Sequence, residues 1–323
     1  PYTQGWFAYV SCSQPDCRFH VDTFRLYQGD YVPYEEAQRR QAADVQVSLF
    51  DTRAPSSTPL SADALVERAR WTQVPEDETD HRFRGDAVIT NDRLAVVLRR
   101  GATGAEVYSR GAAGPVLRAV LAPATEGPEA RLTSTAIVEN TPAAAAVDAT
   151  FTTPDTKKLV LRYELEMGQV FVTTEARRGV AGLHIHAPSR FVVLPDFFAD
   201  DLVVDAAEIP VDRADLPSEN FLLSMLPDRD AIVMSVSGSR DTDAEINLSG
   251  EAPNRTVDGC RLRYGKDGKI WVAVIAAPGV WSVHVFAPSD AGKLVRLEWT
   301  APYPAQWRVD WRRDDDLTGS WEM

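Results

Sequence analysis

Two histidines placed two residues apart are the first side chains in this sequence that can do chemistry. His184 and His186 lie in an alternating, strand-like run, so both side chains point to one face of the strand. Two imidazoles on one sheet face can share a metal ion or bracket a substrate, which makes both candidate catalytic residues. In the alternative interpretation they lie on the solvent face while Leu183, Ile185 and Ala187 face the core.

A group of carboxylates follows the histidines: Asp196, Asp200, Asp201, Asp205 and Glu208. Carboxylates at the end of a strand can bind calcium through their oxygens, and Asp200, Asp201 and Asp205 are the expected ligands of this possible cofactor. They can also act as an acid and a base on a glycosidic bond, with Asp196 and Asp200 as candidate catalytic residues and Glu208 as a candidate binding residue. The alternative is a solvated turn in which Asp side chains cap backbone N–H groups.

Tryptophan is concentrated in the last third of the chain. Trp307 and Trp311 are four residues apart in a strand-like segment, so they share one face of it. Aromatic faces of this kind stack against the C–H-rich faces of sugars, which makes both residues candidates for carbohydrate binding. The alternative is that their large apolar surface fills the core.

Composition limits the classes of partner. The chain has 323 residues, with 34 Lys and Arg against 47 Asp and Glu, for a formal charge of −13. This balance argues against nucleic-acid binding, which needs a concentrated positive surface. No apolar run reaches the roughly 20 residues of a membrane-spanning helix. The sequence also lacks the motifs of nucleotide-driven enzymes, zincins and α/β-hydrolases.

Three cysteines bear on the cellular compartment. Cys12 and Cys17 flank a turn-like sequence, and they form either a disulfide or two free thiols. Cys12, Cys17 and His20 offer too few ligands for a recognisable metal motif. Cys260 is expected to be a small buried residue. The chain begins at Pro1 and ends at Met323, and we expect it to be a processed or truncated part of a longer protein.

The periodicity of the sequence predicts an all-β fold. Short apolar–polar alternations separated by turn residues run from residue 83 onward, which favours a large antiparallel β-sandwich over residues 72–323. Ser61 caps a predicted helix over residues 61–71 that connects this domain to an aromatic-rich accessory segment, residues 1–60. Asp267-Gly268 predicts a hairpin turn between strands near 261–264 and 269–274.

Thr90–Ser109, which reads TNDRLAVVLRRGATGAEVYS, forms a strand, a Gly-rich turn and a second strand. This stretch of about 20 residues resembles the opening of galactose-mutarotase-like super-sandwich proteins. The resemblance implies a β-super-sandwich, a fold often found in carbohydrate-active enzymes and their accessory domains. The catalytic His pair and Glu of the mutarotases do not map onto this sequence residue by residue, so only the fold is implied.

Two functions remain open at this point. The first is a secreted or periplasmic β-sandwich protein that binds or processes carbohydrate, in which the acids, the histidines and the tryptophans meet in one groove. The second is a non-catalytic structural or assembly domain of a larger extracellular protein, which contacts other protein chains through apolar faces or strand edges. Whether the protein is an enzyme is left undecided.

Overall fold

A computed structural model describes residues 46–111, 114–194, 202–217, 221–238, 244–283 and 289, together with the strands at 308–312 and 318–322. Of these two strands, and of residue 202, only the backbone is described. The chain divides between Gln41 and Ala42, and every described residue belongs to the second unit, residues 42–323. The domain boundaries predicted at residues 60 and 71 stay a prediction.

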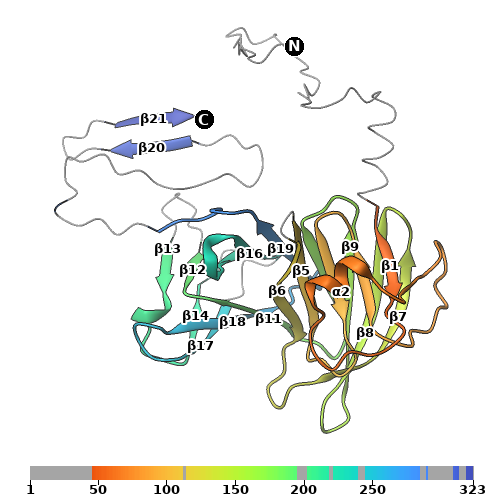
Figure 1. The fold of residues 1–323 in the computed structure, drawn as a ribbon. Helices are drawn as coiled ribbons and strands as arrows, with labels where there is room; N and C mark the ends of the chain where they lie inside the picture. The colour runs from red at the N-terminus through yellow and green to blue at the C-terminus, as the bar shows by residue number, and fades with distance from the viewer. Residues whose placement is uncertain are drawn as a thin grey trace, which may run out of the picture. The chain divides into compact units, whose positions relative to one another are not determined.

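Two large antiparallel sheets form a sandwich (Figure 1). The ten-stranded sheet has, from edge to edge, the order β14 (Arg213–Leu216), β17 (Ala244–Ser249), β18 (Thr256–Arg263), β11 (Gly182–Ser189), β6 (Gly114–Pro123), β5 (Ala105–Gly111), β4 (Leu94–Leu98), β3 (Ala87–Thr90), β1 (Ser48–Asp51) and β2 (Thr72–Gln73). The nine-stranded sheet has the order β13 (Leu202–Asp205), β12 (Phe191–Leu194), β15 (Phe221–Met225), β16 (Ala231–Ser237), β19 (Lys269–Ala276), β10 (Phe171–Arg178), β9 (Lys158–Glu166), β8 (Ala144–Thr152) and β7 (Arg131–Asn140).

The remaining elements are few. One short helix, α2 (Ala62–Glu67), and two 3₁₀ turns, η1 (Ala206–Glu208) and η2 (Pro227–Arg229), are the helical elements of the described residues. Strands β20 (Arg308–Arg312) and β21 (Thr318–Glu322) pair with each other as a hairpin. The prediction of an all-β, antiparallel sandwich with a short helix is therefore confirmed.

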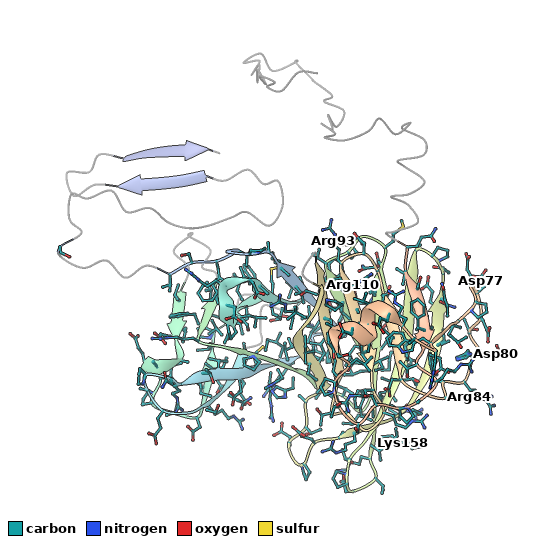
Figure 2. All side chains as sticks on the ribbon, viewed as in Figure 1. Asp77, Asp80, Arg84, Arg93, Arg110 and Lys158 are labelled. Atoms are coloured by element: carbon teal, nitrogen blue, oxygen red, sulfur yellow. The ribbon has the colours of Figure 1, made fainter. Side chains whose placement is uncertain are left out.

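Alternation in the strands produces the layers. In β9, Leu159, Leu161, Tyr163 and Leu165 are buried while the residues between them are partly exposed. The inward side chains of both sheets form one continuous apolar core, as expected when each strand has one face turned to the partner sheet. Charged side chains point outward at the surface, for example Asp77, Asp80, Arg84 and Lys158 (Figure 2).

Polar groups also join the two sheets. The Tyr163 hydroxyl, on β9, donates a hydrogen bond to the Leu121 carbonyl of β6 at 2.7 Å. The buried Asn91 amide, at the turn between β3 and β4, donates to the carbonyls of Glu166, at the end of β9, and Gln169, in the turn that leads to β10. Buried polar groups need such partners to offset their lost hydration, so these bonds fix the relative position of the two sheets.

Two details of the sequence prediction are wrong. The Asp267-Gly268 turn does not close a hairpin, because β18 lies in the ten-stranded sheet and β19 in the nine-stranded sheet. Gly268 has the expected positive φ of 66°, but the turn connects a strand of one sheet to a strand of the other. The predicted helix ends at Glu67 rather than at residue 71, since Arg68 adopts a left-handed conformation. Ser61 caps the helix as predicted, accepting a hydrogen bond from the Ala64 N–H.

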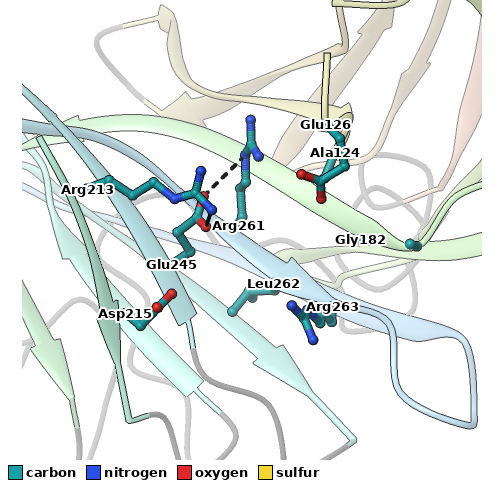
Figure 3. A pocket seen from close by; sticks show the side chains of 10 residues that line it. Ala124, Glu126, Gly182, Arg213, Asp215, Glu245, Arg261, Leu262 and Arg263 are labelled. Carbon is teal, nitrogen blue, oxygen red and sulfur yellow. Dashed lines mark ion pairs between the residues drawn. The ribbon is translucent and has the colours of Figure 1, made fainter.

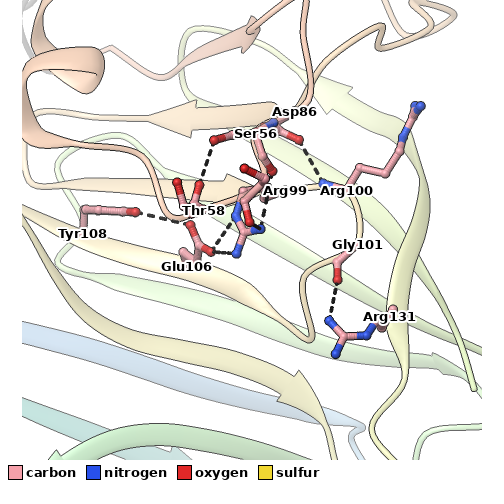
Figure 4. A network of polar contacts seen from close by, with 10 residues as sticks. Ser56, Thr58, Asp86, Arg99, Arg100, Gly101, Glu106, Tyr108 and Arg131 are labelled. Atoms are coloured by element: carbon pink, nitrogen blue, oxygen red, sulfur yellow. Dashed lines mark hydrogen bonds and ion pairs between the residues drawn. The ribbon is translucent and has the colours of Figure 1, made fainter.

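Helix α2 covers part of the outer face of the ten-stranded sheet. Leu65 of α2 packs into a second apolar cluster with Phe50, Val88, Ala95, Val97 and Tyr108. Beside this cluster, the buried Glu106 carboxylate forms an ion pair with Arg99 at 2.6 Å and accepts a hydrogen bond from the Tyr108 hydroxyl (Figure 4). Helix α2 also lies against β6. Strands β1 and β3 to β5 therefore have both faces covered, whereas the outer face from the His184-paired part of β6 to β14 carries the polar side chains described next.

Candidate functional site

A row of polar side chains crosses the outer face of the ten-stranded sheet. Strand pairing places Ala122 opposite His184, His184 opposite Arg261, Arg261 opposite Glu245, and Glu245 opposite Asp215. Residues directly opposite one another project to the same side of a sheet. The row therefore brings one imidazole, one guanidinium and two carboxylates together from four strands.

The next row of outward residues on the same strands includes a glycine, which leaves space above the sheet. It contains Val120, His186, Gly259, Asn247 and Arg213. A Cβ atom on Gly259 would lie 2.4 Å from the Ile185 carbonyl oxygen and 3.1 Å from His184 Nε2. Only glycine fits this position, and its missing side chain leaves room for the His184 ring.

Two adjoining hollows lie over these rows. The first, of about 290 Å³, is lined by His184, His186 and Arg261 together with apolar residues of β6 and the loop that follows it. The second, of about 360 Å³, is lined by Arg261 and the charged residues Arg213, Arg263, Glu126, Asp215 and Glu245. Ala124 and Arg261 line both hollows. In Figure 3, Arg261 lies between Glu245 on one side and Ala124 and Glu126 on the other.

Glu245 is held between two arginines. It forms ion pairs with Arg213 and, at 3.7 Å, with Arg261 Nε. The longer separation exceeds a direct hydrogen bond. Within the described part of the chain, Glu245 Oε1, Arg261 Nε and His184 Nε2 make no hydrogen bond, and surrounding side chains shield all three atoms from solvent. The row thus keeps hydrogen-bonding capacity that its own residues leave unused.

Each hollow taken separately is balanced in formal charge, with Arg261 belonging to both. Three arginines and three carboxylates line the second hollow, while one arginine, one carboxylate and two histidines line the first. Burial, followed by the positive charge of Arg261 and the nearby His186, lowers the pKa of His184 to about 4. His184 is therefore neutral at pH 7, and it can donate from one ring nitrogen and accept at the other.

Of the predicted site residues that the structure describes, the two histidines are the ones that line the hollows. His184 and His186 lie on the outward face of β11, with Leu183, Ile185 and Ala187 buried beneath them, as the alternative interpretation required, and both line the first hollow.

Two of the predicted acids lie on the other sheet. Asp205, at the edge strand β13, forms an ion pair with Arg190 at 3.0 Å and caps η1 through the Ala207 N–H. Hydrogen bonding and charge from Arg190 lower the pKa of Asp205 despite opposition from burial. Glu208 is exposed at the end of η1.

The other predicted site residues lie outside the described residues or are described by backbone alone. Asp196, Asp200, Asp201, Trp307, Cys12 and Cys17 are outside the described ranges, and the side chain of Trp311 on β20 is not described. The catalytic, sugar-stacking and calcium roles assigned to these residues stay predictions. Among the residues that are described, no three His, Cys, Asp or Glu side chains are arranged to hold a metal ion. Cys260 is a free, buried cysteine, and burial raises its pKa to about 12.

The sequence prediction missed four residues of the row and its neighbour: Arg213, Asp215, Glu245 and Arg261. Each sits at a polar position of an alternating strand, so alternation alone would have placed it on an outer face. The missing information was the pairing of β14, β17, β18 and β11, which joins residues as distant in the sequence as His184 and Arg261, 77 positions apart.

Comparisons with known proteins give only distant likenesses. No protein-family model matches the chain, and no curated protein matches it. Among solved structures, a mutant of glycoside hydrolase family 81 from Clostridium thermocellum is similar at a TM-score of 0.31 and 11% identity, covering 60% of this chain and 22% of that one. A quadruple mutant of α-N-acetylgalactosaminidase from Bifidobacterium bifidum gives a TM-score of 0.32 and 11% identity, covering 56% and 33%. This chain thus matches at most a third of either protein.

Proposed function

We propose that the outer face between β6 and β14 binds a neutral carbohydrate. The observation that carries this proposal is the row His184–Arg261–Glu245–Asp215, which places a neutral imidazole, a guanidinium donor and two carboxylate acceptors beneath two hollows. A sugar hydroxyl both donates and accepts, as these side chains do. Concave sites with a few convergent polar groups are where small ligands bind.

The balance of charge supports a neutral ligand over a charged one. A phosphate or nucleic acid would require surplus arginine or lysine, and a divalent cation would require surplus carboxylate. Together the two hollows hold three arginines and four carboxylates, so neither sign of charge is in large surplus. The apolar wall of the first hollow, from Val120, Ala122 and Pro123, is suited to the C–H face of a sugar ring.

The proposal is binding rather than hydrolysis. Glycoside hydrolysis needs one carboxyl group that keeps its proton and a second that is ionised. Glu245 is engaged by Arg213 and Arg261, so its carboxylate is held within the row rather than free to act on a glycosidic oxygen. We further propose that the protein acts outside the cytoplasm, in the extracellular or periplasmic space where it meets polymeric carbohydrate.

Binding can be tested with an array of neutral oligosaccharides, followed by titration calorimetry on the best ligands. Arg261→Ala is expected to weaken binding at least tenfold and Arg261→Lys to restore part of it. Glu245→Gln is expected to weaken binding because one carboxylate oxygen and the negative charge that pairs with the arginines are lost. Arg93→Ala is the matched control, since Arg93 is exposed and, among the described residues, forms an ion pair only with Asp92. No binding by the wild type, or equal binding by Arg261→Ala, would refute the proposal.

A second candidate function, assembly with another copy of this chain, is favoured by the nine-stranded sheet. Outward residues on its β15 and β16 strands are apolar and partly exposed, namely Leu223, Met225, Ile232, Met234 and Val236. The β8–β9 half of the same face carries an Arg162–Asp148 ion pair instead. Two copies could meet through the uncharged half without bringing their negative charges into contact.

Sedimentation velocity over a range of protein concentrations tests this second candidate. A dimer that dissociates in the Met234→Lys variant would support it. A wild-type protein that stays monomeric at all concentrations would exclude it.

A further inference from the structure

We infer that the two hollows are adjoining subsites, so that the ligand is an oligosaccharide of two or more units and Arg261 contacts both units. This inference rests on the proposed carbohydrate binding and specifies the size of the ligand.

The sizes of the hollows support this assignment. A pyranose with its hydroxyls occupies roughly 200 Å³ at the packing density of organic crystals. Hollows of about 290 and 360 Å³ each accommodate one such ring with little room for a second. Because Ala124 and Arg261 line both hollows, a ligand that fills one reaches the border of the other.

The two hollows also differ in chemistry. The first hollow combines an apolar wall from Val120, Ala122 and Pro123 with two imidazoles and Arg261, so it suits a ring that stacks its C–H face on the wall and makes hydrogen bonds at its edge. Arginines and carboxylates dominate the second, so it favours hydroxyl groups presented on several sides. Two successive sugar units of one oligosaccharide present both kinds of surface.

Arg261 occupies the position where one residue can serve both units. It lies opposite His184 on one side and Glu245 on the other. A guanidinium offers five N–H donors in a fixed plane, and Arg261 Nε makes no hydrogen bond with the described residues. Nε is shielded from solvent, but the side chain as a whole is 30% exposed, so its terminal N–H groups are the donors that can contact hydroxyls on either side of the border.

Each hollow is lined by exposed side chains that do not line the other, and one from each is suitable for substitution. His186 lines only the first hollow and Asp215 only the second, and both are exposed, so their replacement by alanine leaves the core intact. Asp80→Ala is the matched control, because Asp80 is exposed and lines neither hollow.

The experiment is calorimetry with cello-, xylo- and manno-oligosaccharides of one to six units. We expect affinity to rise at least tenfold between the monosaccharide and the di- or trisaccharide and then to level off. His186→Ala and Asp215→Ala should each weaken oligosaccharide binding at least fivefold, and at most one of them should affect the monosaccharide.

The outcomes separate the two proposals. If an oligosaccharide binds no more tightly than its monosaccharide, or if only one of the two variants affects oligosaccharide binding, the subsite inference is wrong while carbohydrate binding stands. If no oligosaccharide of any length binds, here or on the array, the proposed function itself fails.

Discussion

His184 shows how a single side chain acquires its properties from its neighbours. Its strand position places it on an outward face, yet its ring lies over Gly259 and beside Arg261. Burial and the adjacent guanidinium together lower its pKa to about 4. A histidine on a sheet surface thus becomes a neutral hydrogen-bonding group across the physiological range.

This shift predicts a pH-dependent stability. The unfolded histidine has a pKa near 6.5, so between pH 6.5 and about 4 the unfolded chain binds a proton that the folded chain does not. The free energy of unfolding should therefore fall as pH decreases through this window, by at most about 3 kcal/mol. Urea unfolding at pH 7 and pH 4.5 should show a smaller fall for His184→Gln than for wild type. An identical fall in both proteins would contradict the lowered pKa.

At the scale of elements, the short helix α2 contributes through what it covers. Six residues are too few for a helix to be stable alone, so its stability comes from the Ser61 cap and from packing over β1, β3, β4 and β5. The Arg68 guanidinium stacks on Phe50 at 4.4 Å, and Trp71 packs against the same ring. The element therefore closes one half of the sheet face and leaves the other half to the hollows.

Replacing Leu65 by alanine tests this covering role. Leu65 is 4% exposed, and its neighbour Val66 is 66% exposed. Leu65→Ala should lower the free energy of unfolding by about 2–4 kcal/mol because it leaves a cavity in the second cluster. Val66→Ala should change it by less than about 0.5 kcal/mol. Chemical denaturation of the two variants makes the comparison, and equal effects would show that α2 does not seal the cluster.

At the scale of the whole molecule, the two sheets share one core and are expected to unfold together. The chain passes between them repeatedly. The consecutive strands β11 and β12 lie in different sheets, and so do the consecutive strands β18 and β19. Neither of the two large sheets is built from one continuous stretch of sequence, so neither can form completely without the other. The Tyr163 hydrogen bond to Leu121 is one of the polar links across this core.

Tyr163→Phe probes the link with little change in shape. Removing the hydroxyl leaves the buried Leu121 carbonyl without this donor, which should cost about 1–2 kcal/mol. Denaturation followed by tryptophan fluorescence and by circular dichroism should give coincident single transitions, shifted to lower denaturant in the variant. Transitions that separate in the variant would mean that the sheets unfold independently.

The sequence by itself determined what depends on near neighbours. Alternation specified the strands and their inward faces, Ser61 marked the start of α2, and the pair His184 and His186 was correctly expected to share one face. These features follow from the geometry of one strand or one helical turn.

Only the tertiary structure decided which strands pair and in which register. The turn at Asp267-Gly268 has the local chemistry of a hairpin, but the strands on its two sides find partners elsewhere. Likewise, cross-strand pairing between residues distant in the chain is what brings together Arg213, Asp215, Glu245 and Arg261. Register is set by burial of whole strand faces in a shared core, a property that no single segment of the sequence contains.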